Sequence, residues 1–336
     1  MKKILKKIGK GLLILLGIIF LALLGMTIYN TIITMQESKS LASMGQTVSV
    51  EGQNMQIDVQ GSGEHTIVLL SGLGTYSPIE DFRPLATELS KHNQVVTVEY
   101  FGYGLSADTE EARTNDNIVA EIREALSQAD IEPPYILAAH SLSGVYALDY
   151  IQEYPDEVEA LVGIDPSVPN QVDYESGMPI AEWLYYPSRA FDIVGISRME
   201  LKEDPMLQEM ADSGSYSTEA LDRIKAVKAK RSASMALIRE NNTISENLTE
   251  LKGVKYPDSL PVLTFLADDT MNQSDEMFAE KGYDITWEKL HEDLITNSSI
   301  QKMEILTGTH YLHWTNSEKM ASEITEFIEQ AVDSKL

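Results

Sequence analysis

The sequence predicts an α/β protein: an eight-stranded, mostly parallel sheet with helices on both faces, a helical cap after the sixth strand, and an N-terminal transmembrane helix. Three observations lead to this prediction. Short apolar runs alternate with amphipathic helical patterns, the strand pattern disappears between residues 166 and 259, and a long uncharged apolar segment comes first. The remaining chain of about 300 residues suits one large domain with an insertion.

The first 34 residues form a separate unit. Five lysines, the last of them Lys10, precede an uncharged apolar run from Gly11 to about Ile33, which is long enough to span a bilayer. The lysines favour a cytoplasmic N-terminus, with the rest of the chain outside the cytoplasm. A cleaved signal peptide is the alternative, with a weak site at residues 40–42, but such signals have a shorter apolar core.

Residues 35–46 are expected to form a polar stalk before a folded domain over residues 47–336. Within that domain, helical patterns such as residues 116–129 place apolar side chains on one face. Eight short apolar runs bounded by turn residues are typical of strands. These runs cover residues 47–51, 54–60, 65–70, 94–99, 135–140, 159–164, 261–266 and 300–306.

Glycine-containing turns follow the third and fourth of these strands. The first is SGLGT at residues 71–75, and the second is EYFGYGLS at residues 99–106. Phosphate binding is one interpretation of such turns. However, neither has the complete dinucleotide-binding spacing or a Walker lysine, so nucleotide binding is not expected.

The fifth strand ends at a serine between small residues. Ala139 and Ser143 stand two positions before and after Ser141, as in a G-x-S-x-G nucleophile elbow. Such a turn puts the serine at a helix N-terminus, where backbone N–H groups favour developing negative charge. Acyl transfer needs two such donors, and we assign the amides of Leu142 and Leu73. An ordinary strand-to-helix connection with a solvated serine is the alternative.

Residues 166–259 are predicted to form a helical cap, because Leu221, Ile224 and Val227 recur at helical spacing. Large, adaptable apolar side chains are frequent in it. We expect most of them to form the core of the cap and some to line a pocket for an apolar substrate. They are Met178, Trp183, Leu184, Tyr185, Tyr186, Phe191, Met199, Met206 and Met210.

The chain is strongly acidic. Removing the five leading lysines from the 26 basic residues leaves 21 against 52 acidic residues, a net charge of −31. Nucleic acid is therefore not an expected partner, because its phosphates would be repelled. An acidic surface also keeps an exposed domain soluble. The chain has no cysteine, which excludes disulfides and lipidation at a thiol.

Several short motifs follow one another along the chain: GLG at 72–74, GYGLS at 102–106, PY at 134–135, HSLSG at 140–144, YPDEV at 154–158 and DPSVPNQ at 165–171. Together they resemble the α/β-hydrolase superfamily, in its branch of small, esterase- and lipase-like serine hydrolases. The resemblance extends over about residues 48–332 and implies the α/β-hydrolase fold and a Ser-His-Asp triad, with no metal or organic cofactor. Ser71 replaces the usual histidine before the first glycine, and Ala139 precedes the elbow histidine, so only the shape of the oxyanion hole departs from the pattern.

The resemblance implies a catalytic base on a loop after the last strand. His310 matches that motif, and His313 is the alternative, which we expect to pack or hydrogen-bond beside the site. His140 adjoins Ser141 but points the wrong way round a sharp turn. The pair His310 and His313 lacks a carboxylate or cysteine partner at metal-binding spacing, so no metal is predicted. Solvated or capping roles are expected for the other histidines, His65, His92 and His291.

The triad acid must be a carboxylate at the carboxyl end of a strand, where it can orient the imidazole. Asp165, after the sixth strand, is preferred because its Asp-Pro-Ser context looks like that of some lipases. Asp268 and Asp269, after the seventh strand, are the alternatives. Many superfamily members carry the acid there, but the matching register falls on Thr270. Either choice keeps the chain order Ser, Asp, His.

These observations lead us to expect a membrane-anchored serine hydrolase that acts on an apolar carboxylic ester through an acyl-enzyme. A peptidase or amidase is an alternative, since the triad is shared and the cap determines the leaving group. A non-catalytic binding or sensing protein on the same fold is a second alternative. An aspartate-nucleophile epoxide hydrolase or dehalogenase is excluded, because position 141 is serine.

Overall fold

The computed structural model describes residues 2–174 and 177–333 and contains the predicted eight-stranded sheet, in the order β1-β2-β4-β3-β5-β6-β7-β8. β1 pairs antiparallel with β2, and β2 with β4, while the other five pairings are parallel. The predicted α/β fold class is therefore confirmed. The strands are β1 (Gln46–Val50), β2 (Gln53–Gln60), β3 (Thr66–Leu70), β4 (Gln94–Glu99), β5 (Tyr135–His140), β6 (Val158–Ile164), β7 (Val262–Ala267) and β8 (Gln301–Leu306).

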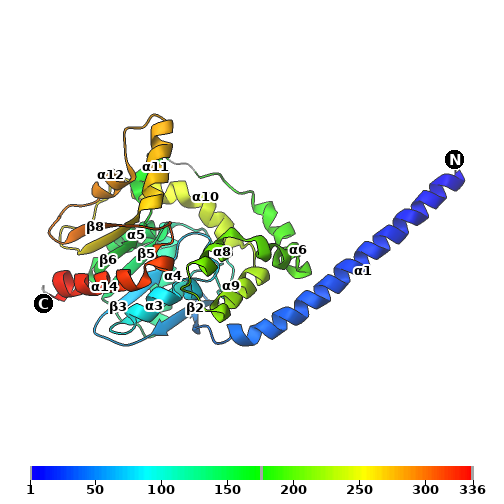
Figure 1. Ribbon diagram of the computed structural model, residues 1–336, viewed down its shortest axis with the longest axis horizontal. Helices are drawn as coiled ribbons and strands as arrows, with labels where there is room; N and C mark the ends of the chain where they lie inside the picture. Colours follow the sequence, from blue (N-terminus) through cyan, green and yellow to red (C-terminus); the bar gives the residue numbers. More distant parts are fainter. Residues whose placement is uncertain (1, 175–176, 334–336) are drawn as a thin grey trace.

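Helices cover both faces of the sheet (Figure 1). Ile67 and Leu69 of β3 lie in one buried cluster, with α3 (Arg83–Leu89) and α14 (Ser317–Phe327). Val68 points to the opposite face, because side chains alternate along a strand. The remaining helical elements of the hydrolase domain are α2 (Pro78–Asp81), α4 (Asn115–Gln128), α5 (Ser143–Glu153), η1 (Pro155–Glu157), α11 (Asp268–Glu280), α12 (Trp287–Glu292), α13 (Leu312–Thr315) and η5 (Ile328–Val332).

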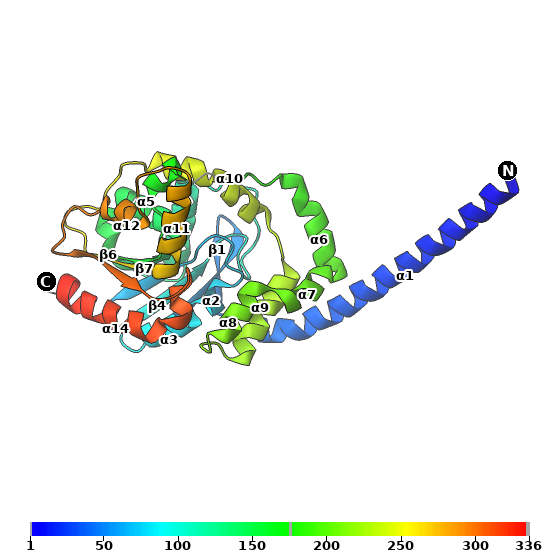
Figure 2. The same cartoon turned by 45° about the horizontal axis from the view of Figure 1, so that its top comes forward.

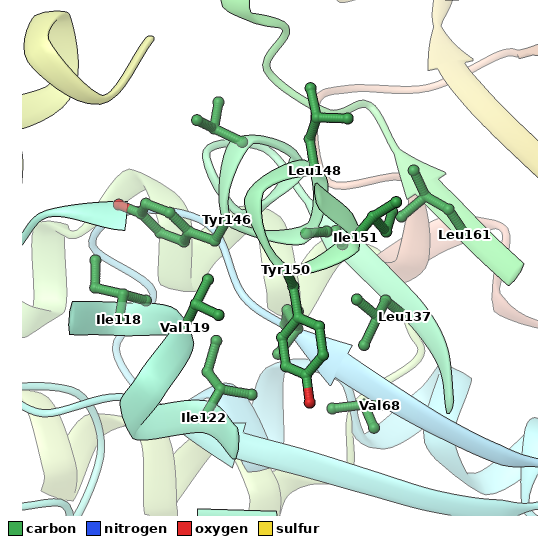
Figure 3. Close-up of a cluster of buried hydrophobic side chains, with 14 of the residues drawn as sticks. Val68, Ile118, Val119, Ile122, Leu137, Tyr146, Leu148, Tyr150, Ile151 and Leu161 are labelled. Atoms are coloured by element: carbon green, nitrogen blue, oxygen red, sulfur yellow. The ribbon is translucent and has the colours of Figure 1, made fainter. Parts of the chain in front are cut away.

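The second face carries the larger buried cluster, which joins α4 and α5 to the central strands. Figure 3 shows Ile118 of α4 beside Tyr146 of α5 and Ile122 beside Tyr150, with Val68 and Leu137 of the sheet on the other side of Tyr150. This packing fixes α5 directly behind β5. The turn between these two elements, which contains the predicted nucleophile, is thereby held by a rigid strand and a rigid helix.

Helices are the only regular secondary structure in the described part of residues 166–259, as the loss of the strand pattern predicts. The expectation that most large apolar side chains of this cap are buried in it is wrong. Met206 and Met210 do pack in the cap core, but six others are exposed: Met178, Trp183, Leu184, Tyr186, Phe191 and Met199. The cap elements are η2 (Pro169–Asp173), η3 (Glu182–Leu184), α6 (Tyr185–Val194), α7 (Ile196–Glu200), η4 (Leu201–Glu203), α8 (Pro205–Asp212), α9 (Thr218–Lys230) and α10 (Met235–Glu250).

The apolar N-terminal segment is one helix, α1 (Lys2–Leu41), which projects from the domain (Figure 2). Its apolar part is long enough to cross a membrane, or to be a signal sequence. The polar stalk expected at residues 35–46 is helical as far as Leu41. In this last part of α1, Leu41 packs with Ala226 and Val227 of α9, and Glu37 forms an ion pair with Arg198 of α7, so cap contacts hold the polar residues in the helix.

Candidate active site

Ser141 lies on the turn between β5 and α5. Its φ of +53° is in the left-handed region, which a residue with a side chain occupies only when its surroundings enforce it. The Ser141 amide donates to the carbonyl of Ile164 at 3.3 Å, and the Ser167 amide donates to the Ser141 carbonyl at 2.7 Å. A Cβ on Gly144 would lie 2.6 Å from the Pro166 Cβ, so glycine is required where the elbow meets the turn after β6.

Asp165 and His310 meet beside this turn. The His310 Nδ1 and Asp165 Oδ2 atoms are 2.7 Å apart, and the Asp165 side chain is completely buried. Asp165 Oδ1 also accepts the Ala267 amide at 3.1 Å, which fixes the carboxylate between β6 and β7. An ionised Asp165 places the His310 proton on Nδ1, and the lone pair is then on Nε2. The His310 side chain is about one-third exposed.

The alternative acids occupy a different position. Asp268 Oδ1 accepts the Gly308 amide at 2.9 Å, and this hydrogen bond holds the pKa of Asp268 below its ordinary value. The Asp269 amide donates to the Gly308 carbonyl. Both residues stand in the first turn of α11 and brace the loop that carries His310. The geometry therefore brings Asp165, and not Asp268, to the imidazole.

His140 joins the elbow to the His310 loop. Its Nε2 donates to the His310 carbonyl at 3.0 Å, and the two rings have centroids 4.7 Å apart. Burial, and then the nearby rings of His310 and His313, hold the pKa of His140 well below its ordinary value. His140 is therefore neutral and carries its proton on Nε2. It acts as a link between two loops.

His313, the alternative base, hydrogen-bonds in the interior. Its Nε2 lies 2.6 Å from Asp81 Oδ2, and the Trp314 indole donates to Asp81 Oδ1 at 2.9 Å. The His313 side chain has no exposed surface. Asp81 is on α2, so these two hydrogen bonds attach α13, and with it the loop of His310, to α2.

The glycine turn after β3 faces the elbow. A Cβ on Gly72 would lie 2.7 Å from the Ser141 Cβ, so only glycine permits this close approach. Within the described residues, the amides of Leu73 and Leu142 donate to no protein acceptor. Both remain available to a ligand, as an oxyanion hole requires.

Ser143, which stands at a glycine position of the elbow pattern, makes contacts that the pattern did not predict. The Tyr100 hydroxyl lies 2.7 Å from Ser143 Oγ, and the Ser143 hydroxyl donates to the carbonyl of Ser71. Tyr100 must therefore be the donor to Ser143. This chain of hydrogen bonds connects α5 to the start of the glycine turn, so Ser143 positions the two predicted oxyanion donors relative to each other.

A buried carboxylate of the cap reaches the same region. Glu240 on α10 accepts the hydroxyls of Tyr103 at 2.8 Å and Tyr146 at 2.9 Å. The Tyr103 oxygen in turn accepts the Gly74 amide at 3.3 Å. Burial raises the pKa of Glu240, and the nearby guanidinium of Arg113 opposes that rise. Sequence reasoning missed this connection, because Glu240 lies in an otherwise ordinary helical pattern.

His291 is also buried, so the solvated or capping role expected for it is wrong. It is 2% exposed, and its Nε2 lies 2.9 Å from the carbonyl oxygen of Pro166, directly after Asp165. His291 thus supports the turn that carries the acid. A signal was present: Trp287, Leu290, His291 and Leu294 share the helical spacing of a buried face.

A cavity of about 210 Å³ lies beside the glycine turn. Gly74 and Tyr76 of the turn and Val227, Arg231 and Leu237 of the cap are among the residues that line it. The cap thus contributes apolar side chains next to the predicted oxyanion loop, but from other residues than the nine named above.

One group of carboxylates has a spacing that suits a metal ion. Oxygen atoms of Asp116, Asp149 and Glu153, on α4 and α5, lie within 4.8 Å of one another. The group contains no member of the predicted triad. The expectation that catalysis needs no metal stays a prediction.

The family model of the alpha/beta hydrolase family matches residues 67–321, about three-quarters of the sequence. The chain belongs to this family. The match extends from β3 to α14, so it contains the elbow, the cap, the acid turn and the histidine loop.

Relatives in Bacillus subtilis are similar over part of the chain. The protein named Uncharacterized protein YbdG is 33% identical over 157 residues, which are 47% of this chain and 48% of that protein. Uncharacterized protein YqjL is 30% identical over 109 residues, 32% of this chain and 42% of that protein. The matches thus span about half the length of these relatives or less.

Solved structures share the fold at low identity. An esterase from Exiguobacterium antarcticum is 17% identical with a TM-score of 0.57, covering 85% of this chain and all of that one. The epoxide hydrolase CorEH is 16% identical with a TM-score of 0.60, covering 84% of this chain and 98% of that one. The enzymes named in these two structures act on different bonds, so the likeness identifies the fold and a hydrolase architecture.

Proposed function

We propose that the protein is a serine hydrolase that cleaves apolar carboxylic esters through a covalent acyl-enzyme. The observation that carries this proposal is the 2.7 Å contact between Asp165 and the Nδ1 of His310, beside a serine on a strained elbow turn. With its proton held on Nδ1, His310 offers the Nε2 lone pair to the Ser141 hydroxyl.

In the proposed reaction, Ser141 Oγ attacks the ester carbonyl carbon while His310 removes the hydroxyl proton. The negative charge that develops on the carbonyl oxygen is stabilised by the amides of Leu73 and Leu142. His310 then donates its proton to the leaving alkoxide as the ester bond breaks. Water, deprotonated by His310, attacks the acyl-enzyme, and the carboxylic acid leaves with the serine restored.

We further propose that α1 anchors the enzyme in a membrane, with the lysine-rich end in the cytoplasm and the hydrolase domain outside. The length and hydropathy of α1 support the span, and the lysines support the orientation.

The test is hydrolysis by the full chain in detergent, using an ester and an anilide of the same medium-chain acyl group. We expect ester turnover and, with an activated ester whose acylation is faster than hydrolysis of the acyl-enzyme, an initial burst of alcohol. Ser141→Ala should abolish the burst. Ester turnover that survives in Ser141→Ala contradicts the proposal, and faster anilide than ester cleavage would indicate an amidase.

A further inference from the structure

The cap exposes a cluster of large apolar side chains near α1. We call this cluster the cap face and define it by Met178, Trp183, Tyr186, Phe191, Ile193 and Met199, each of which is at least 49% exposed. Large apolar side chains exposed side by side usually mark contacts with another phase or molecule.

Part of the cap face follows the helical repeat of η3 and α6. Trp183, Tyr186, Ala190 and Ile193 are all exposed and lie three or four residues apart, so they share one side of the helix. Another side of α6 is buried: Asp192 accepts the hydroxyls of Ser197 and Ser232. α6 therefore presents an apolar side to the outside and a polar side to the cap.

The C-terminal end of α6 is fixed to α1. Asn30 Nδ2 donates to the carbonyls of Asp192 at 2.8 Å and Ile193 at 3.3 Å. Arg198 donates to Asn30 Oδ1 at 3.0 Å and forms two hydrogen bonds with Glu37, of 2.6 and 2.8 Å. Gly195, at a φ of +88°, allows this approach, because a Cβ there would lie 2.9 Å from the Asn30 Cβ.

Asn30 also lies where the membrane span should end. Gly11 to Asn30 is an uncharged helical stretch whose length, at about 1.5 Å per residue, matches a hydrocarbon core of about 30 Å. Figures 1 and 2 both show α6 running across the direction of α1. If α1 crosses the bilayer, α6 therefore lies along the membrane plane, at the boundary of the hydrocarbon.

We infer that the cap face rests in the headgroup–acyl boundary of the outer leaflet of the bilayer that α1 spans. Tryptophan, tyrosine and phenylalanine on one side of an in-plane helix are the side chains that this boundary favours. The proposal rests on the proposed membrane anchor. It adds that the cap, beside the active-site loops, touches the lipid directly, so that an ester dissolved in the bilayer meets the cap first.

Tryptophan fluorescence tests this contact. Trp183 is 66% exposed, whereas Trp287 and Trp314 are 5% and 1% exposed. The full chain is reconstituted in phosphatidylcholine vesicles whose acyl chains carry bromine near the headgroup, and its emission is compared with that in unbrominated vesicles. We expect several-fold stronger quenching in the wild type than in Trp183→Phe, which loses the only tryptophan of the cap face.

A matched control places a tryptophan far from α1. Tyr283, in the turn between α11 and α12, is 40% exposed. Figures 1 and 2 both show α11 and α12 on the side of the domain away from the projecting part of α1. Trp183→Phe combined with Tyr283→Trp should not regain the quenching by brominated lipid. Thermal unfolding monitored by circular dichroism confirms that each variant is folded.

The outcomes separate this inference from the proposals on which it rests. Protein that floats with the vesicles but shows equal quenching in the wild type and Trp183→Phe overturns it. Quenching of Trp183 by aqueous acrylamide but not by brominated lipid overturns the inference as well. Quenching of Trp183 by neither agent also overturns it. Protein that fails to float contradicts the membrane anchor itself. Esterase activity is measured separately, through Ser141→Ala.

Discussion

At the scale of single residues, two aspartates follow neighbouring strands but have different environments. Asp165, with a φ of +43°, is buried and faces the His310 Nδ1. Asp268 binds the Gly308 amide at the start of a helix, where a carboxylate is favoured by the helix dipole. The first environment holds the His310 imidazole, as the proposed base requires, and the second braces a loop.

This difference predicts the effects of two matched substitutions. Asp165→Asn should lower kcat by about 10³–10⁴-fold, because an amide does not hold the His310 proton on Nδ1 or stabilise the imidazolium. Asp268→Asn keeps an oxygen acceptor for the Gly308 amide and should change kcat far less. Steady-state kinetics on a soluble ester measure both. Equal losses of kcat, or a larger loss in Asp268→Asn, would contradict the proposal that Asp165 is the triad acid.

Asp149 gives a prediction for pH. Burial, and then the carboxylates of Glu153, Asp116 and Glu250, raise its pKa from the ordinary 3.8 to about 7. Because the folded chain holds this proton more tightly than the unfolded chain, the free energy of unfolding falls as the pH rises from about 4 to about 7, and Asp149 lowers it no further above that.

Asp149→Asn removes the titrating carboxylate, so the variant should not show this fall in the free energy of unfolding. The variant should gain about 1–2 kcal/mol over the wild type near pH 8, and clearly less near pH 5. Urea denaturation of the full chain in detergent at both pH values measures the gain. Asp284→Asn, at an exposed position, is the control. A gain that is the same at both pH values speaks against a raised pKa at Asp149.

At the scale of elements, α10 of the cap is connected to the catalytic loops by a buried polar network. Glu240 accepts two tyrosine hydroxyls, and Tyr103 also accepts the amide of Gly74, next to the predicted oxyanion donor Leu73. Buried networks of this kind rigidify a structure only when their groups are paired. The cap is thus part of the support of the oxyanion loop as well as a cover.

Glu240→Ala should destabilise the protein by about 2–4 kcal/mol, since it leaves the buried hydroxyls of Tyr103 and Tyr146 without their acceptor. Glu240→Gln retains one acceptor oxygen and should cost less. Chemical denaturation gives the two free energies, and kcat on a soluble ester should fall in the same order. A glutamine variant as unstable as the alanine variant would contradict a hydrogen-bonding role.

The strands and the elbow could be predicted because their signals are local. The eight apolar runs match the observed strands to within one residue at every end, and residues 139–143 are enough to predict the turn at Ser141. The bonds of Ser143, Glu240 and His291 join segments far apart in the chain, so no local pattern contains them. The exposed cap face escaped prediction because a run of large apolar residues normally signals a core.

At the scale of the whole molecule, one long helix and one acidic domain form an elongated protein with charge of opposite sign at its two ends. The lysines of the N-terminal end precede the apolar stretch, and the net charge of −31 follows it. The lysines next to the apolar stretch favour retention of the N-terminal end in the cytoplasm. The domain and its cap would then lie against the outer membrane surface.

The absence of cysteine makes this orientation directly testable. Ile8→Cys introduces a single thiol at the lysine-rich end, and Ser298→Cys introduces one at an exposed position of the domain. In intact cells, a membrane-impermeant maleimide should label Ser298→Cys and not Ile8→Cys, whereas both should react after permeabilisation. Labelling of Ile8→Cys and not of Ser298→Cys in intact cells would show that the orientation is the opposite of the proposed one.

Activity-based labelling tests the central claim, the activated serine, most directly. The full chain in detergent is treated with a fluorophosphonate, and the adduct is located by mass spectrometry. We predict one adduct, on Ser141, formed at a rate that falls sharply in His310→Ala and Asp165→Asn and little in Asp268→Asn. A folded protein that gains no adduct, or an adduct rate at Ser141 that does not depend on His310, would contradict the account.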